Sequence, residues 1–462
     1  MPSKYLIHPV DAPNRNAPLS KSGIIAREEG CLKCPVCVKT KCVYNVYKDR
    51  KLDPIKMVDS LDYNCKNCFR CIQSCPKQLI HKSFHQEFEQ MGQYPFTSEV
   101  IAQIWQQATT GKVPVSGAGY HGPFSGPGFD SMWTDMSEIV RPTRDGIHGR
   151  EYISTAVDLG DKPDHLSFHE ISQGKDHPLV TIPLPILFRL PAVGGIGSNT
   201  LKGWGAAARY LGTLISLSKA HLWMVSPKVV QNTIIELDSS HDLMNFQDPL
   251  GIEISSELNW EDLYSSAKEI YPHKLIILRV PLKNGFVEVI KRAYEYGIRL
   301  IHVQASFEGS FFDSGLHIKD GIRKVHLSLL DMGVRDQVTV LASGGIALAE
   351  HVAKAIICGA DAVFVDTALQ VALECRLCRR CELEIGCPAD IQSASPLWVA
   401  RRSINLMSAW HNQLLEILGA MGIRDIRRLR GETGRAMLFE ELERETFRGL
   451  NKIREGEEIE LS

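Results

Sequence analysis

Short apolar runs alternate with amphipathic helical patterns between about residues 180 and 375. The runs are rich in β-branched side chains and apolar nearly throughout, which is typical of strands buried on both faces of a parallel sheet. They cover residues 274–280, 299–305, 338–345 and 362–368. The helical patterns between them each end in glycine, as helices commonly do, and cover residues 285–297, 318–333 and 348–359. This alternation predicts βαβ units, and hence an α/β fold that is either a (β/α)8 barrel or a doubly wound sheet.

Cysteine spacing is the second constraint, because 12 of the 13 cysteines fall in three runs of four. The second run is Cys65-x2-Cys68-x2-Cys71-x3-Cys75, followed by Pro76. This is the spacing of bacterial ferredoxins, in which three thiolates bind one iron–sulfur cluster and the fourth binds its neighbour. The first run, Cys31-x2-Cys34-x2-Cys37-x4-Cys42, follows the same logic with one extra residue and no proline after it.

Together these two runs predict a module that holds two [4Fe–4S] clusters. The expected ligand sets are Cys31, Cys34, Cys37 and Cys75 for one cluster, and Cys65, Cys68, Cys71 and Cys42 for the other. Structural zinc is the alternative, but zinc prefers two separated cysteine pairs to triplets.

The third run is Cys375-x2-Cys378-x2-Cys381-x5-Cys387, and it follows the apolar run 362–368 directly. In a barrel this position lies at the carboxyl-terminal rim, where active sites are found. The run predicts a further iron–sulfur cluster, either [4Fe–4S] or, with three ligands, [3Fe–4S]. The remaining cysteine, Cys358, stands alone on a helical pattern and is expected to be a small core residue rather than a nucleophile.

Small residues lie next to the last two apolar runs. In a barrel, the loops after these strands commonly bind phosphate through backbone N–H groups that glycine leaves exposed. A cofactor phosphate beside an iron–sulfur cluster points to FMN, which takes up two electrons and releases them singly. A glycine-rich turn before a helix further upstream is a weaker candidate for the same cofactor site. The candidate FMN-binding residues are Gly194, Gly195, Gly197, Ser198, Ser343, Gly344, Gly345, Gly359, Ala360, Asp361 and Thr367.

Composition excludes several classes of protein. The 52 Lys and Arg residues nearly balance 54 Asp and Glu, for a net charge of −2, so no global basic field attracts nucleic acid. No apolar stretch is long enough to insert in a membrane, and the first residues lack the pattern of a signal peptide. We therefore expect a cytoplasmic protein in a reducing compartment, with cysteines that bind metal rather than form disulfides.

At these residues the sequence resembles the FMN-binding synthase domain of the glutamate synthase family, in the short archaeal-type form with its own ferredoxin module. The resemblance spans about residues 26 to 450 and is strongest in segments 122–154, 341–346, 359–368, 378–388 and 420–447. It implies a (β/α)8 TIM barrel that binds FMN, an N-terminal ferredoxin-like module and a C-terminal helical extension. It also implies reductive conversion of 2-oxoglutarate and ammonia to glutamate, with electrons passing from the clusters to the flavin.

The sequence departs from the family pattern mainly where the substrate is expected. Segments 194–200, 214–226, 234–254 and 306–310 differ from the glycine-rich and lysine-containing loops of the family, and Asp366 replaces a glycine before Thr367. The scaffold and the electron path are therefore expected to persist around an altered substrate pocket. Residue 2 is proline, so the N-terminal cysteine of a fused glutaminase is absent and ammonia is expected from solution or a partner chain.

The domain organisation follows from these changes of pattern. The expected segments are an arm (1–25), the two-cluster module (26–95), a loop-rich connection with one helix (96–178), the FMN-binding barrel (179–374), the third cluster loop (375–392) and a helical extension (393–462).

The leading hypothesis is an iron–sulfur flavoprotein oxidoreductase of glutamate synthase type, acting on 2-oxoglutarate or a related small molecule. A ferredoxin or a reductase subunit is the expected electron donor, and a separate glutaminase or other redox subunits are possible partners. Two alternatives are an electron-transfer subunit of a larger redox complex and a related flavoenzyme acting on another carbonyl, imine or amine. No catalytic residue is assigned; His302, Gln304, Glu308 and Lys202 are candidates, but for each of them we favour a structural role over a catalytic one.

Overall fold

Eight parallel strands close into a barrel in the computed structural model of the chain. The structure describes residues 7–26, 30–48, 60–113, 126–134, 153–162, 178–191, 196–237, 248–432 and 436–438. The barrel strands are β6 (Ile186–Arg189), β7 (Ile215–Ser218), β8 (Thr233–Leu237), β9 (Gly251–Ser255), β10 (Leu275–Pro281), β11 (Leu300–Gln304), β12 (Thr339–Ser343) and β13 (Ala362–Val365). Because β13 pairs with β6 and β9 with β10, the sheet has no free edge, which decides for a TIM barrel over a doubly wound sheet.

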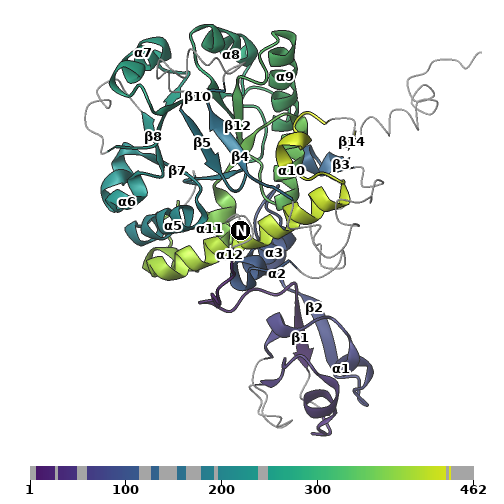
Figure 1. Cartoon of the computed structure of the whole chain (residues 1–462). Helices are drawn as coiled ribbons and strands as arrows, with labels where there is room; N and C mark the ends of the chain where they lie inside the picture. Colours follow the sequence, from purple (N-terminus) through teal and green to yellow (C-terminus); the bar gives the residue numbers. More distant parts are fainter. Residues whose placement is uncertain are drawn as a thin grey trace, which may run out of the picture.

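Helices follow the strands and form an outer ring around the barrel (Figure 1). The predicted strands and helices of the second half are confirmed, because their apolar runs are buried in the barrel wall and the amphipathic segments cover it. The helices are α5 (Ser198–Leu211), α6 (Pro227–Val230), α7 (Trp260–Ile270), α8 (Phe286–Glu295), α9 (Ile318–Asp331), α10 (Ala349–Cys358) and α11 (Thr367–Ala372), with a 3-10 helix η8 (Lys219–Met224) after β7.

The amino end of the barrel is covered by a separate antiparallel pair, β4 (Val157–Gly160) and β5 (Leu179–Ile182). Gly160 exchanges hydrogen bonds with the Thr339 side chain, at the first residue of β12. The barrel therefore begins at β6, and residues 179–182, which we expected within the barrel domain, lie outside its closed sheet.

A long helix, α12 (Pro396–Ala420), crosses the outside of the barrel against α5, α3 (Ser98–Thr110) and α10 (Figure 1). It confirms the helical expectation for this part of the C-terminal segment. Two short elements complete this region, η11 (Ile426–Leu429) and β14 (Ala436–Leu438). Strand β14 pairs with β3 (Met132–Thr134), which directly follows the 3-10 helix η6 (Gly128–Ser131). Among the described residues, no helix is both long and apolar enough to cross a membrane.

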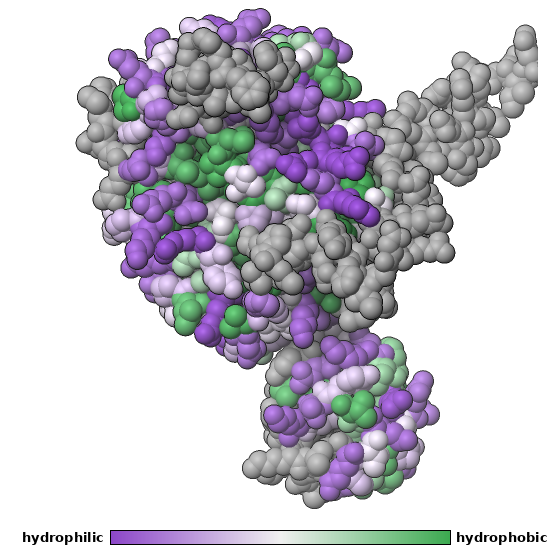
Figure 2. Space-filling view, in the orientation of Figure 1, coloured by the Kyte–Doolittle hydropathy of each residue, from purple (hydrophilic) through white to green (hydrophobic). Residues whose placement is uncertain are grey.

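The first two cysteine runs lie in a small lobe that stands apart from the barrel (Figures 1 and 2). Its sheet pairs β1 (Ser22–Ala26) with β2 (Ile80–Phe84). Its short helices are η2 (Val36–Lys41), η4 (Asp62–Asn64) and α1 (Arg70–Gln73). The lobe has its own small core around Val46 and Tyr47. The chain returns to the barrel through α2 (Gln86–Glu89) and α3, and a 3-10 turn η10 (Ile391–Ser393) precedes α12.

Candidate functional site

A cavity of about 390 Å³ opens at the carboxyl ends of the barrel strands. Residues at the ends of six strands meet around it, so side chains distant in sequence share one space. Those that contribute polar groups are Arg189, Ser218, His221, Glu236, Gln304, Ser306, Ser343, Asp366 and Thr367. This is the end of a TIM barrel that carries active sites, and the volume suits a small ligand.

The predicted phosphate loop forms one wall of this cavity. Gly344 has a φ of +105°, and a Cβ there would lie 2.5 Å from the carbonyl oxygen of Ser306. Gly345 has a φ of +70°, and a Cβ there would lie 2.8 Å from the Cα of Gly309. Glycine is therefore required at both positions, because a side chain would strain the backbone and collide with the neighbouring loop.

Thr367 lies on the same wall, at the first residue of α11. Its backbone N–H already donates to the side chain of Asp366, and burial raises the pKa of Asp366. Asp366 therefore places a carboxyl group at the start of α11, where it takes up the first free N–H of the helix.

Arg189 is the buried cation of the cavity. It is 7% exposed, and among the described residues its Nη1 has no hydrogen-bond partner. A cavity whose wall includes Gly344, with a buried guanidinium that has one nitrogen, Nη1, without a hydrogen-bond partner, fits a flat, anionic cofactor such as FMN.

Gly359, Ala360 and Asp361 do not belong to this site, which corrects the prediction that they bind the cofactor. They precede β13 and therefore lie at the amino end of the barrel, opposite the cavity. Asp361 accepts hydrogen bonds from Arg335 at 2.9 Å, Arg430 at 2.8 Å and the Val340 N–H at 2.8 Å. Burial alone would raise the pKa of Asp361, but the adjacent cations hold it below its ordinary value. The segment is a buried structural ion network.

The upstream glycine turn is only partly described. Gly194 and Gly195 lie outside the described residues. Gly197 caps α5 and Ser198 begins it. A Cβ on Gly197 would lie 3.6 Å from Gln392, so this turn faces the loop of the third cysteine run. Neither Gly197 nor Ser198 is among the residues that line the cavity.

Four charged side chains form a ring inside the barrel beneath the cavity, and sequence reasoning missed all of them. Arg189 Nη2 lies 3.2 Å from Glu236 Oε1 and 3.4 Å from Glu253 Oε1. Arg279 Nη1 lies 3.4 Å from Glu236 Oε2, and its Nε lies 3.5 Å from Glu253 Oε1. Each of the four is an isolated charge within an apolar strand. Because buried charges are expected only in pairs, such a lone charge in the sequence could have indicated a buried ion pair.

His302 connects this ring to the cavity wall. Its Nδ1 lies 2.9 Å from Glu253 Oε2, and its Nε2 lies 2.8 Å from the Ser343 hydroxyl oxygen. Of the other catalytic candidates, Gln304 lines the cavity, whereas Lys202 and Glu308 are exposed and do not.

The third cysteine run surrounds a second, small cavity of about 40 Å³, which all four thiols line. Burial, with smaller effects from the other three cysteines, raises the pKa of Cys375 to about 12. The Leu377 N–H lies 3.4 Å from the Cys375 sulfur. Four convergent thiols with a backbone N–H donor fit an iron–sulfur cluster. Cys358, in contrast, is 5% exposed against Met132, as expected of a core residue.

In the small lobe, Cys71 interacts electrostatically with Cys65 and Cys42. Lys82 Nζ donates to the Cys65 sulfur at 2.9 Å, and the Leu79 N–H donates to the Cys75 sulfur at 3.4 Å. The proximity of Cys42 to Cys71 of the second run fits the exchange of fourth ligands between clusters.

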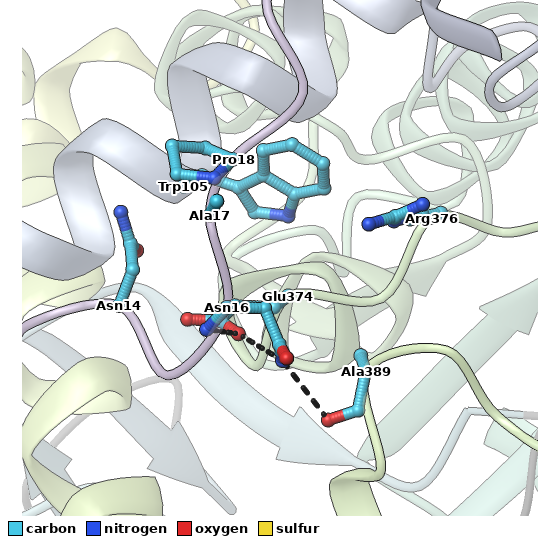
Figure 3. Close-up of a pocket in the computed structure, with 8 residues that line it drawn as sticks. All are labelled: Asn14, Asn16, Ala17, Pro18, Trp105, Glu374, Arg376 and Ala389. Atoms are coloured by element: carbon cyan, nitrogen blue, oxygen red, sulfur yellow. Dashed lines mark hydrogen bonds between the residues drawn. The ribbon is translucent and has the colours of Figure 1, made fainter. Parts of the chain in front are cut away.

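The N-terminal arm is fastened to the start of the third cysteine run. Glu374 accepts hydrogen bonds from the Arg15 N–H at 2.7 Å, and from the Asn16 N–H and side-chain amide at 3.1 and 2.9 Å. Figure 3 shows the hydrogen bonding of Asn16 with Glu374 beside Trp105 of α3 and Arg376. The loop next to Cys375 is therefore held by the segment that leads into the small lobe.

The conserved region in glutamate synthase matches residues 303–424. An archaeal-type glutamate synthase [NADPH] from Dehalococcoides mccartyi is 26% identical, over 87% of this chain and 92% of that protein. The archaeal glutamate synthase [NADPH] of Archaeoglobus fulgidus is 25% identical, over 88% of this chain and 91% of its own length. That of Methanocaldococcus jannaschii is 40% identical over 128 residues, or 26% of this chain and 25% of that protein.

Solved structures with related backbones include a flavocytochrome b2 mutant with benzoylformate, with a TM-score of 0.44 and 13% identity over 76% of this chain and 81% of that one. A mandelate oxidase mutant with an FMN adduct has a TM-score of 0.43 and 15% identity over 66% of this chain and 87% of that one. At these scores the fold assignment rests on the strand order of the barrel itself.

Proposed function

We propose that the chain is a member of the glutamate synthase family, which the matched region and the similarity to archaeal-type glutamate synthases support. On this basis it is an iron–sulfur flavoprotein oxidoreductase that reduces a small substrate in its barrel cavity. The observation that carries the proposal is the cavity at the carboxyl end of the barrel, whose wall includes Gly344. The cysteine loop that follows α11 lines a separate cavity.

Electrons would enter at the small lobe, from a ferredoxin or a reductase subunit. The two [4Fe–4S] clusters would be held by Cys31, Cys34, Cys37 with Cys75, and by Cys65, Cys68, Cys71 with Cys42. The interaction of Cys42 with Cys71 supports this exchange of ligands.

The third cluster would be held by Cys375, Cys378, Cys381 and Cys387. All four thiols line one cavity, which suits [4Fe–4S], while three of them suffice for [3Fe–4S]. Its loop follows α11 and is fixed to the arm by Glu374, which supports its place between the lobe and the barrel cavity.

FMN would supply the chemistry that joins one-electron clusters to two-electron reduction of a substrate. Gly344 and Gly345 would let it approach the backbone, Arg189 would offer a buried cation, and Ser343 and Thr367 lie on the same wall. By the sequence prediction, the residues Gly194, Gly195, Gly197 and Ser198, which follow β6 along the chain, would also contact the cofactor, although Gly197 and Ser198 do not line the cavity.

The substrate by this proposal is 2-oxoglutarate, reductively aminated to glutamate, or a related small molecule. Ammonia would come from solution or from a separate glutaminase. The cavity favours an enzyme over an electron-transfer subunit, because several polar groups converge in it. Leu383 and Ile385, exposed by 68% and 59% between two cysteines of the third run, favour the alternative of docking to a further redox subunit.

The proposal is tested by anaerobic incubation of the full chain with 2-oxoglutarate, ammonia and a low-potential electron donor. We expect glutamate to form with oxidation of the donor. Bound, reducible FMN without any glutamate would reject this activity and leave the two alternatives, which a screen of other carbonyl and imine substrates separates.

A further inference from the structure

We propose that Glu253 and His302 position the Ser343 hydroxyl so that its oxygen faces the cavity as a hydrogen-bond acceptor, and that the cavity ligand presents an N–H donor there. Ser343 is then a specificity-determining residue for an amino or imino nitrogen, rather than a ligand of phosphate. The inference rests on the proposed function only in that the cavity takes a ligand.

The three residues form a continuous hydrogen-bonded chain inside the barrel, across one half of its sheet from β9 to β12. Glu253 lies on β9, His302 on β11 and Ser343 on β12, with contacts of 2.9 and 2.8 Å between them. They are 1%, 0% and 3% exposed, so no solvent competes for the hydrogen bonds. Ser343 nevertheless belongs to the cavity wall, so this buried chain ends at the ligand space.

The charge on Glu253 determines which group donates in each of these hydrogen bonds. Burial opposes ionisation, but the charges of Arg189 and Arg279 and the hydrogen bond from His302 hold the pKa of Glu253 below its ordinary value. An ionised carboxylate only accepts hydrogen bonds, so His302 Nδ1 must carry the proton. If the imidazole is neutral, its Nε2 then has only a lone pair, and the Ser343 hydroxyl must donate to it.

The surroundings of His302 keep the imidazole neutral. Burial lowers the pKa of His302 to about 4, and Arg189 and Arg279 add to this effect against the opposing charge of Glu253. The groups that face the ring are Glu253 from β9, Arg279 from β10, Arg189 from β6, Ser343 from β12, and Phe364 from β13 at 4.5 Å between ring centres. None of them supplies a second negative charge at the ring.

With its proton committed to His302, Ser343 has only lone pairs left for the cavity. Glu236 and Asp366 line the same space and also carry acceptor oxygens. A phosphate or carboxylate oxygen at Ser343 would meet an acceptor, which is unfavourable when both are shielded from water. An N–H donor satisfies Ser343, and a cationic one is further favoured by the nearby carboxylates.

The test uses the full chain as purified, with histidine rings labelled with ¹⁵N, in long-range ¹H–¹⁵N NMR spectra between pH 6 and 8. We expect one neutral histidine with its proton on Nδ1, whose Nε2 signal changes in Ser343→Ala. The matched control is Ser216→Ala, which removes another buried barrel serine, one that donates to Glu236 at 2.9 Å instead, and leaves that signal unchanged. If Ser343→Ala does not fold, Ser343→Cys gives the same comparison, because a thiol is a weak donor and acceptor.

Ligand class is tested on the same sample with methylammonium and acetate as probes. Methylammonium should shift the His302 signal saturably, and its affinity should fall about tenfold in Ser343→Ala, the loss expected for one charge-assisted hydrogen bond. A proton on Nε2, a charged ring, no saturable effect of methylammonium, or Ser343-dependent binding of acetate would overturn the inference. Absence of flavin from the preparation would instead count against the proposed function, since the His302 tautomer does not depend on it.

Discussion

The backbone N–H of Arg15 donates a 2.7 Å hydrogen bond to the Glu374 carboxylate, across 359 residues of sequence. Glu374 directly precedes Cys375 and is 6% exposed. The arm and the start of the third cysteine run are therefore one structural unit, although nothing in the sequence of either segment indicates this contact.

Glu374→Ala should release the arm, because it removes the acceptor of three hydrogen bonds. We expect a loss of about 2–3 kcal/mol in the free energy of unfolding, as for hydrogen bonds to a charged group, and faster proteolysis within residues 7–18. Chemical denaturation and timed digestion measure the two effects. Glu374→Gln, which keeps one acceptor oxygen, should lie between the parent and Glu374→Ala; equal stability of all three chains would contradict the role of this contact.

Gly344→Ala should reduce flavin binding. The left-handed φ and the 2.5 Å approach to the Ser306 carbonyl oxygen require the loop to shift, at a cost of about 1–3 kcal/mol. Flavin content per chain after purification measures the effect. Gly315→Ala is the control, because a Cβ there meets nothing within 4 Å; if both variants keep full flavin, the glycine wall does not hold the cofactor.

Asp361→Asn should destabilise the barrel without affecting its cavity. Removing the charge leaves Arg335 buried and unpaired, which costs about 3 kcal/mol. Because the folded-state pKa of Asp361 is lowered, its contribution is complete above the ordinary pKa of about 3.9 and is lost as pH falls through the folded-state value. In chemical denaturation, parent and variant should therefore differ in stability at pH 7, and this difference should shrink at acid pH. A loss of flavin with unchanged stability would restore Asp361 to the cofactor site.

Cys378→Ser should remove the third cluster and lower the iron content by about three or four atoms per chain. Cys358→Ser is the control: Cys358 lies in the core against Met132, and its thiol pKa is raised to about 12 by burial, so iron should not change although stability falls. Equal iron in parent and Cys378→Ser would contradict the assignment of the third run.

The barrel could be predicted from the sequence because its strands are continuous apolar runs, as in 274–280 and 299–305, and its helices have matching amphipathic patterns. The cysteine runs could be recognised because cluster ligands are close in sequence. Asp361 was assigned to the cofactor site because loops of small residues before and after a strand have a similar composition. The two kinds of loop nevertheless lie at opposite ends of a barrel.

The charged ring could not be predicted for a different reason. Arg189, Glu236, Glu253 and Arg279 come from four strands, and their pairing depends on the stagger that closes the barrel. Sequence shows each only as a lone charge in an apolar run. The hydrogen bond between Ser343 and His302 could not be predicted from the sequence either, because it joins residues 41 positions apart.

The most direct test of the account is to measure iron, acid-labile sulfide and flavin together in the full chain purified under anaerobic conditions. If all three cysteine runs and the barrel cavity are filled, about eleven or twelve iron atoms and one FMN per chain are expected. About eight iron atoms without flavin would contradict the account, because the chain would then be a two-cluster protein with an unused barrel.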